Sequence, residues 1–242
     1  MSYIFREHIK QSLAVIAFLI TLTACTSESY DAGDGPNSYL TADLVLLHTS
    51  QDKSVRSALL DDGTTLQFSN PFAQDWLTRP DSVYRALLYY DKTVAASDAA
   101  APNSTATSIV RARSVRPVSV LRPVEVEDME ALRTDPVGFE SLWMSKNGSY
   151  INLSLLLKSG KTEADDALHA LGIVSHGTTT DADRRRTLHL TLYHDQGGVP
   201  AYYTVQQYVS IPTQLLEEAD TIELTLNTYN GNKVVKVAVS NL

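Results

Sequence analysis

The stretch VRSALLDDGTTLQF, residues 55–68, contains two short runs of strand-forming residues around Asp61-Asp62-Gly63. An Asp-Gly pair between apolar runs indicates a tight hairpin turn, because glycine adopts the positive φ of such a turn without strain. Similar strand-forming runs lie on both sides, at 38–49, 83–90 and 109–115. We therefore expect about five β-strands in this part of the chain.

A second series of strands follows a charged segment. Before that segment, residues 118–126 still belong to the first series and alternate around Pro123, which suits an edge strand. The segment 125–136 is the best domain boundary because it is highly charged. The later strands are expected at 139–144, 149–157, 168–175, 186–194, 201–211, 221–228 and 234–239. Asn230-Gly231 predicts a hairpin between the last two. Six or seven short strands with frequent turns favour an antiparallel β-sandwich.

Composition limits the classes of protein that remain. The chain has 242 residues, 43% of them apolar and 20% charged, which is enough for one large or two modest domains. A single cysteine excludes an intrachain disulfide framework and a zinc ribbon. The formal net charge of −8 offers no bulk attraction to a phosphate backbone, so no nucleic-acid partner is expected.

The cysteine lies at the end of an apolar stretch. Residues 12–24, SLAVIAFLITLTA, follow Arg6 and Lys10 and are too short to span a bilayer, which takes about 20 residues. This pattern predicts a secretory signal. Leu22, Thr23, Ala24 and Cys25 resemble the lipobox of bacterial lipoproteins in all four positions. The resemblance implies signal-peptidase cleavage before Cys25, diacylation of its sulfur and acylation of the new amino terminus.

These features divide the chain into four segments. We expect a lipoprotein signal peptide at 1–24, a flexible tether at 25–36, a first β domain at 37–124 and a β-sandwich at 125–242. The tether is polar and acidic, so it cannot bury enough apolar surface to order itself. A lipid anchor makes the membrane the expected partner. Because no aspartate directly follows Cys25, we expect outer-membrane placement, with the periplasmic or surface face left open.

Several short motifs resemble the NigD-like lipoprotein family of Bacteroidota. Besides the lipobox, they are LLDDGTTL at 59–66, VYRA at 83–86, VRPV at 115–118, DPV at 135–137 and SYINL at 149–153. The resemblance implies an all-β protein with a small OB-type five-stranded barrel followed by an immunoglobulin-like antiparallel sandwich. It supplies no catalytic residues. The family name comes from an association with a bacteriocin locus.

The sequence contains no catalytic or metal-binding pattern. His189 and His194 are five residues apart on an expected strand, so they point to opposite faces and cannot share a metal without a β-bulge. There is no G-x-S-x-G nucleophile motif. We therefore expect no enzyme activity, no catalytic residue, no metal and no cofactor.

Two kinds of side chain could form a binding surface. Arg111, Arg113 and Arg116 could form a basic binding stripe near Tyr89 and Tyr90, although arginines on an edge strand also discourage aggregation. Trp76, Trp143 and twelve tyrosines would suit a carbohydrate. Because the aromatic content is average, we expect most of these rings to serve packing.

Two Asp-Ser/Thr-apolar triplets match the O-glycosylation pattern of exported proteins in this group of bacteria. They place Ser82 and Thr221 as candidate modification sites. Each triplet also suits a strand-entry turn stabilised by an aspartate side chain.

The residues together predict a non-enzymatic binding or accessory module of the cell envelope, with a protein, peptide or glycan partner. Two alternatives stay open: an enzyme acting on envelope or dietary polysaccharide, and a component of bacteriocin defence or secretion. An enzyme would need a cleft with a carboxylate or histidine of shifted pKa.

Overall fold

The computed structural model describes residues 40–92, 107–125, 132–161, 168–216 and 219–239. Within these ranges all regular elements are β-strands, apart from one 3₁₀ turn at Thr213–Leu215. They form a closed barrel followed by two further sheets, which confirms the predicted all-β barrel and sandwich. Leu40–Leu242 is one compact unit. No helix in the described part of the chain is long and apolar enough to cross a membrane.

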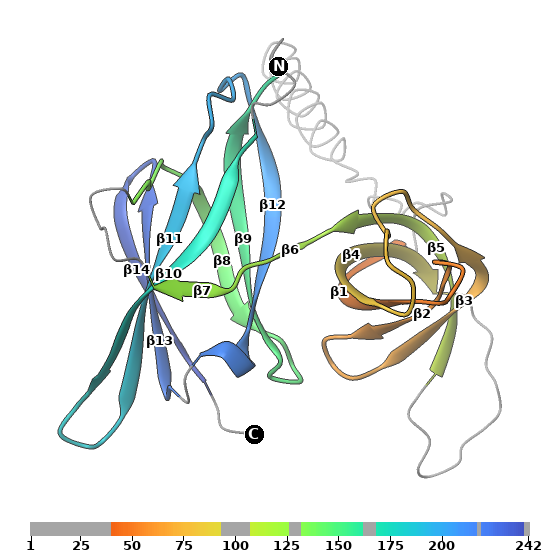
Figure 1. Cartoon of the computed structure of the whole chain (residues 1–242), viewed down its shortest axis with the longest axis horizontal. Coiled ribbons are helices and arrows are strands. Elements are labelled where there is room, and N and C mark those ends of the chain that lie inside the picture. Colours follow the sequence, from red (N-terminus) through yellow and green to blue (C-terminus); the bar gives the residue numbers. More distant parts are fainter. Residues whose placement is uncertain (1–39, 93–106, 126–131, 162–167, 217–218, 240–242) are drawn as a thin grey trace, which may run out of the picture. The chain divides into compact units, whose positions relative to one another are not determined.

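Five strands close the barrel, as the sequence predicts. They are β1 (Leu40–Thr49), β2 (Val55–Leu60), β3 (Thr65–Phe72), β4 (Val83–Lys92) and β5 (Thr107–Pro117), drawn in orange to green in Figure 1. Their order is β1-β2-β3-β5-β4, and antiparallel pairing of β1 with β4 closes the ring. The predicted turn at Asp61-Asp62-Gly63 joins β2 to β3, with Gly63 at φ 87°.

Strand alternation gives the barrel an apolar interior and a mixed outer face. Along β4, Ala86, Leu88 and Tyr90 belong to the barrel core. The intervening residues Arg85 and Leu87 are also buried, although side chains alternate between the two faces of a strand. The outer face of β4 is therefore covered by another part of the chain.

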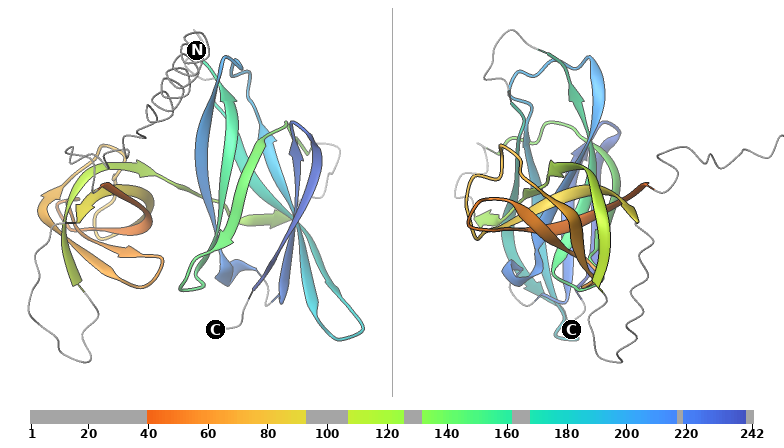
Figure 2. Two further views of the ribbon diagram at one scale, coloured as in Figure 1. Left: turned by 180° about the vertical axis from the view of Figure 1, so that it is seen from behind. Right: turned by 90° about the vertical axis from the view of Figure 1, so that its right-hand side faces the viewer.

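Nine strands form the two sheets of the sandwich (Figure 2). One sheet has the order β14-β13-β11-β10-β7, and the other has the order β6-β12-β9-β8. Their bounds are β6 Ser119–Val120, β7 Pro123–Glu125, β8 Gly138–Met144, β9 Tyr150–Ser159, β10 Ala170–Thr180, β11 Arg186–Asp195, β12 Tyr203–Pro212, β13 Thr221–Thr228 and β14 Gly231–Ala238.

The expected strand at 118–126 pairs with strands of the sandwich. The expected strand 118–126 is divided into β6, which pairs with β12, and β7, which pairs with β10, so both belong to the sandwich. The charged segment at 125–136 therefore begins after the chain has already entered the sheets of the sandwich. Both pairings are parallel, as is that of β11 with β13, a detail that strand periodicity does not reveal because it is the same in either direction.

The sandwich core comes from regular alternation on facing strands. Leu188, Leu190 and Leu192 of β11 are each at most 2% exposed, and β13 contributes a similar row. Strand β9 is different, because Asn152 and Ser154 are buried alongside its apolar residues. Asn152 therefore lies on a covered face outside the sandwich core, where it needs polar partners.

Candidate binding site at the barrel–sandwich junction

A small apolar cluster fills the junction between the barrel and the sandwich. Leu44 of β1, Leu87 of β4 and Val118 are buried together there. Tyr89, Trp143 and Tyr208 pack against them from β4, β8 and β12. This cluster is separate from the two domain cores, and it explains why Leu87 is buried although it points out of the barrel.

A polar network lies beside this cluster. The guanidinium of Arg85 donates to both carboxylate oxygens of Asp61, with Nη1–Oδ1 at 2.5 Å and Nη2–Oδ2 at 2.7 Å. From the same group, Nη2 donates to Asn152 Oδ1 at 3.0 Å and Nε donates to Ser210 Oγ at 3.2 Å. Two barrel residues are therefore bonded to two sandwich residues.

The network satisfies its members almost completely. Asn152 Nδ2 donates to Asp61 Oδ2 at 3.1 Å, and Ser210 Oγ donates to Asn152 Oδ1 at 2.7 Å. The guanidinium also lies over the ring of Tyr150, 4.3 Å from its centre. Because the Arg85 side chain is only 1% exposed, these contacts are needed to offset its desolvation. The network fixes the hairpin of the barrel against β9 and β12.

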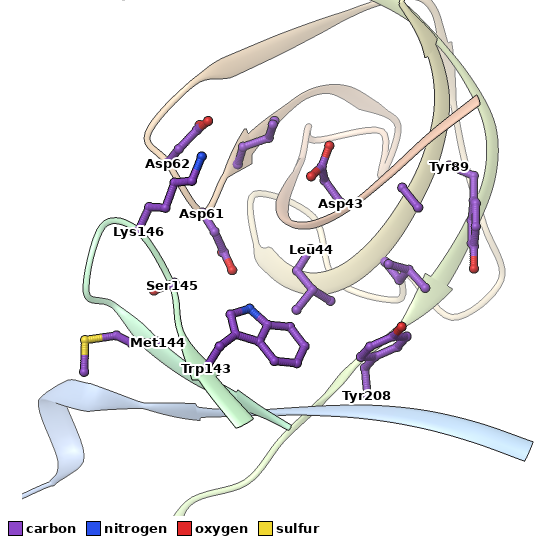
Figure 3. Close-up of a pocket in the computed structure, with 13 residues that line it drawn as sticks. Asp43, Leu44, Asp61, Asp62, Tyr89, Trp143, Met144, Ser145, Lys146 and Tyr208 are labelled. Carbon is purple, nitrogen blue, oxygen red and sulfur yellow. The ribbon is translucent and has the colours of Figure 1, made fainter. Parts of the chain in front are cut away.

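Next to the network is a pocket of about 350 Å³ (Figure 3). The barrel contributes β1, β4 and the Asp61–Asp62 turn, and the sandwich contributes β8, the turn after it, and β12. Among its side chains are Asp43, Asp62, Tyr89, Trp143, Lys146 and Tyr208. A cavity with apolar walls and a few convergent polar groups is the usual form of a small-ligand site.

The carboxyl group of Asp62, whose pKa is shifted, is suited to accepting hydrogen bonds in the pocket. The backbone N–H of Thr64 donates to Asp62 Oδ1 at 2.9 Å. That bond, with a further contribution from the charge of Lys146, lowers the pKa of Asp62. A lowered pKa keeps this carboxylate charged, whereas a general acid needs a raised pKa. Asp62 is therefore better suited to binding than to proton transfer.

The three arginines of the predicted basic stripe lie on β5, and none of them lines this pocket. Arg111, Arg113 and Arg116 are all exposed. Arg113 is already paired with Asp91, whose Oδ2 accepts from its Nε at 2.5 Å. A role for these arginines in binding stays a prediction.

The histidines have separate partners, as their spacing suggests. His189 Nδ1 lies 3.0 Å from Glu223 Oε1, whereas His194 is buried and stacks on His169. His169 Nδ1 and His194 Nε2 are 3.0 Å apart. Within the described residues no group of three or more His, Cys, Asp or Glu side chains is placed to hold a metal ion.

The two candidate glycosylation residues differ in their surroundings. Ser82 is half-buried and follows Asp81, which has a φ of 44°, and its hydroxyl donates to Pro80 O at 2.8 Å. Thr221 lies within β13, which pairs with strands on both sides. Cys25 and the recognition residues Leu22, Thr23 and Ala24 lie outside the described residues, as does the tether at 25–36.

Two of the aromatic residues form the pocket wall, while others pack inside the barrel. Trp76 and Tyr84 pack against the barrel core, and Tyr90 is part of it. Trp143 and Tyr208 instead meet edge to face at the junction, with ring centres 6.3 Å apart and planes at 83°. The sequence pointed to Trp143 as an aromatic candidate and contained Arg85 in the VYRA motif, but it predicted neither the contact of Trp143 with Tyr208 nor the bonds of Arg85 to the sandwich, because both depend on residues far apart in the chain.

The described residues define an all-β protein in which a closed barrel is joined to a β-sandwich, with a pocket at the junction. Residues 120–239 match the family of the NigD-like C-terminal beta sandwich domain. The second half of the chain is therefore a NigD-like C-terminal β-sandwich domain, which confirms the resemblance seen in the sequence. No curated protein matches the chain significantly.

Solved structures from Bacteroides species share the fold. A NigD-like immunity protein from Bacteroides caccae is 23% identical, with a TM-score of 0.59 over 81% of this chain and 91% of that chain. A candidate lipoprotein from Bacteroides fragilis is 14% identical, with a TM-score of 0.59 over 84% and 98%. A protein of unknown function from Bacteroides vulgatus is 17% identical, with a TM-score of 0.57 over 82% and 90%. None of these three names describes an enzyme.

Proposed function

We propose that this protein is a lipid-anchored, non-enzymatic binding module of the cell envelope, and that its ligand occupies the junction pocket. The observation that carries the proposal is the pocket itself, built from two domains whose contact is held by the Arg85 network. A pre-formed pocket needs little ordering on binding, so less interaction energy is lost. The polar groups around it suit recognition, and the lowered pKa of Asp62 suits a permanent acceptor.

The anchor is the second part of the proposal. Cys25 carries the lipid after cleavage, and the tether at 25–36 separates the barrel from the outer membrane. The candidate lipoprotein from Bacteroides fragilis, which has the same fold, supports a lipid anchor. Two or more acyl chains provide stable anchoring, at about 0.8 kcal/mol for each buried methylene.

Substitution of the anchor tests the location. We expect Cys25→Ser to accumulate as uncleaved precursor or as soluble periplasmic protein, whereas wild type fractionates with the outer membrane. Thr26→Ala, next to the cysteine, serves as a matched control that retains processing. A Cys25→Ser protein that is still processed and found in the outer membrane would refute the anchor.

Affinity capture tests the binding function. The full lipidated protein, solubilised gently from native membranes, should retain a partner or ligand that Trp143→Ala loses. Recovery of the same material by both forms would show that the junction pocket is not the binding site.

An immunity function is the second candidate, because the structure from Bacteroides caccae carries that name. It predicts that cells expressing the chain survive a bacteriocin encoded nearby on the genome. Absence of such a gene from the neighbourhood, or equal killing with and without the chain, would count against it.

A further inference from the structure

The junction pocket combines aromatic rings with polar groups that lack partners. Trp143 and Tyr208 form its wall, and in Figure 3 the indole nitrogen of Trp143 faces the side where Asp61 and Leu44 lie. Among the residues that the structure describes, no hydrogen-bond acceptor pairs with that indole N–H. A donor left free beside an apolar ring is available to a ligand that offers both a hydroxyl and a flat C–H face.

Asp43 provides a free acceptor on the barrel side. Its Oδ2 accepts a hydrogen bond from the Tyr90 hydroxyl at 2.8 Å, while Oδ1 has no partner in the described part of the chain. Burial, and then the Asp43 carboxylate, raise the pKa of Tyr90, so the phenol remains the donor of this bond. The tyrosine thus holds the carboxylate in place and leaves one oxygen for a ligand.

Lys146 and Asp62 provide a donor and an acceptor side by side. In Figure 3 their charged ends point toward each other across the rim of the pocket. Lys146 is exposed and has no hydrogen bond to any described residue. Two neighbouring hydroxyl groups match such a pair, because one can donate to the carboxylate while the other accepts from the ammonium.

The charges of the pocket favour a neutral ligand. Arg85 neutralises Asp61, and Lys146 offsets Asp62, so Asp43 is left with the one charge that no cation faces among the described side chains. An anionic ligand would be repelled by Asp43. A cationic ligand would be attracted by Asp43 but would have to approach Lys146, whose ammonium repels it. A polyhydroxylated neutral ligand avoids both costs.

We propose that the junction pocket binds a neutral pyranose sugar, stacked on Trp143 and hydrogen-bonded through adjacent hydroxyls to Lys146 and Asp62 and through a third to Asp43. This inference rests on the proposed binding function and specifies the ligand class. A volume of about 350 Å³ is at the small end of ligand pockets, so the site accommodates one or two sugar rings of a longer glycan.

Tryptophan fluorescence gives a direct test. Because the chain has two tryptophans, Trp76→Phe is used as the background, so that the emission comes from Trp143. The probes are glucose, galactose, mannose, N-acetylglucosamine and fucose, each titrated into the high millimolar range, followed by disaccharides of those that respond. We expect a saturable change in emission with at least one of them.

Two variants and one control locate the bound sugar. Lys146→Met changes an exposed side chain, so it leaves the fold intact, and it should weaken binding about tenfold through the loss of charged hydrogen bonds. Trp143→Ala should abolish stacking, with binding followed by calorimetry because the reporter is lost. Tyr202→Ala removes a tyrosine that is 79% exposed and lies outside the pocket, so affinity should not change.

The outcomes separate the ligand class from the binding function. A saturable response that Lys146→Met weakens and Tyr202→Ala preserves supports the sugar. No response to any of these sugars, or a response that is unchanged in Lys146→Met, overturns the sugar proposal. Saturable binding of tetramethylammonium, a cationic probe, in place of the sugars also overturns it. In those cases, a partner that is captured from membranes and lost in Trp143→Ala would still support the proposed binding function.

Discussion

Arg85 and Asp61 form a two-bond ion pair at the junction of the two domains, with the arginine side chain 1% and the aspartate side chain 20% exposed. Both residues belong to the barrel, one to β4 and the other to the β2–β3 turn. The pair is also bonded to Asn152 and Ser210 of the sandwich. The ion pair therefore holds the side chains of Arg85 and Asp61 in the positions from which they bond the barrel to the sandwich.

Replacing Arg85 should destabilise the protein strongly. We expect Arg85→Met to lower the free energy of unfolding by about 3 kcal/mol, because Asp61 and Asn152 lose their main partner in a poorly hydrated site. Urea unfolding followed by circular dichroism measures the loss. Arg113→Met is the matched control, because Arg113 is 42% exposed and its ion pair with Asp91 contributes at most about 1 kcal/mol.

A second substitution distinguishes an unpaired charge from a loss of packing. Asp61→Leu added to Arg85→Met removes the unpaired carboxylate and should recover part of the stability. If the double variant is less stable than Arg85→Met, the carboxylate has a structural role apart from the ion pair. Equal effects of Arg85→Met and Arg113→Met would contradict the importance of the network.

The sandwich core should respond to the loss of one leucine. Leu190 of β11 is 1% exposed and packs between the sheets, so Leu190→Ala should cost about 2–5 kcal/mol. Leu168 is 73% exposed, and Leu168→Ala should change the unfolding free energy by less than about 0.5 kcal/mol. Denaturant midpoints of the two variants measure the difference, and a large loss in Leu168→Ala would contradict the described packing.

The stacked pair His169 and His194 should make stability depend on pH. The carbonyl oxygen of Asp135 lies 2.9 Å from His194 Nδ1 and can only accept, so that nitrogen carries the proton and Nε2 accepts from His169. Burial, and then His194, lower the pKa of His169 below 6.5. Its buried Nε2 has no hydrogen-bond partner among the described residues, and the nearby backbone of Lys158 offsets the lowering of the pKa only in part.

The direction of this pH dependence follows from whether the folded or the unfolded state of the protein binds the proton on His169 more readily. Below pH 6.5 the unfolded chain protonates His169 while the folded chain resists, so stability should fall with falling pH, by at most about 1.4 kcal/mol per pH unit for one proton. Urea unfolding on either side of that pH measures the slope. His169→Asn should flatten it, whereas His176→Asn, which alters an exposed histidine, should retain it. An unchanged slope in His169→Asn would assign the dependence to another group.

The surroundings of the two glycosylation candidates predict which one carries a sugar. Ser82 is half-buried but lies outside the strands, whereas Thr221 is paired within a central strand and Asp220 accepts from Arg186 N at 2.7 Å. We expect the intact mass of protein from a glycosylating Bacteroidota host to fall by one glycan in Ser82→Ala. Thr221→Val should leave the glycan mass in place. Loss of the glycan in Thr221→Val alone would reverse the assignment.

Local patterns were sufficient to predict the class of fold. The Asp61-Asp62-Gly63 turn and the alternation along β11 and β13 depend on φ preferences and on the two faces of a strand, which act over a few residues. The same locality explains why the partners of 119–125 were not predicted, because whether this segment pairs with the barrel or the sandwich depends on distant strands.

The candidate site depended on contacts that no local pattern contains. Arg85 and Asn152 are 67 residues apart, and each is unremarkable in its own strand, yet they meet at 3.0 Å. Trp143 and Tyr208 likewise become a pocket wall only when β8 and β12 face the barrel. Short-range backbone preferences in this chain therefore predict its strands and turns. Its pocket and the polar network that supports it arise from the packing of two domains, whose complementary groups are far apart in the sequence.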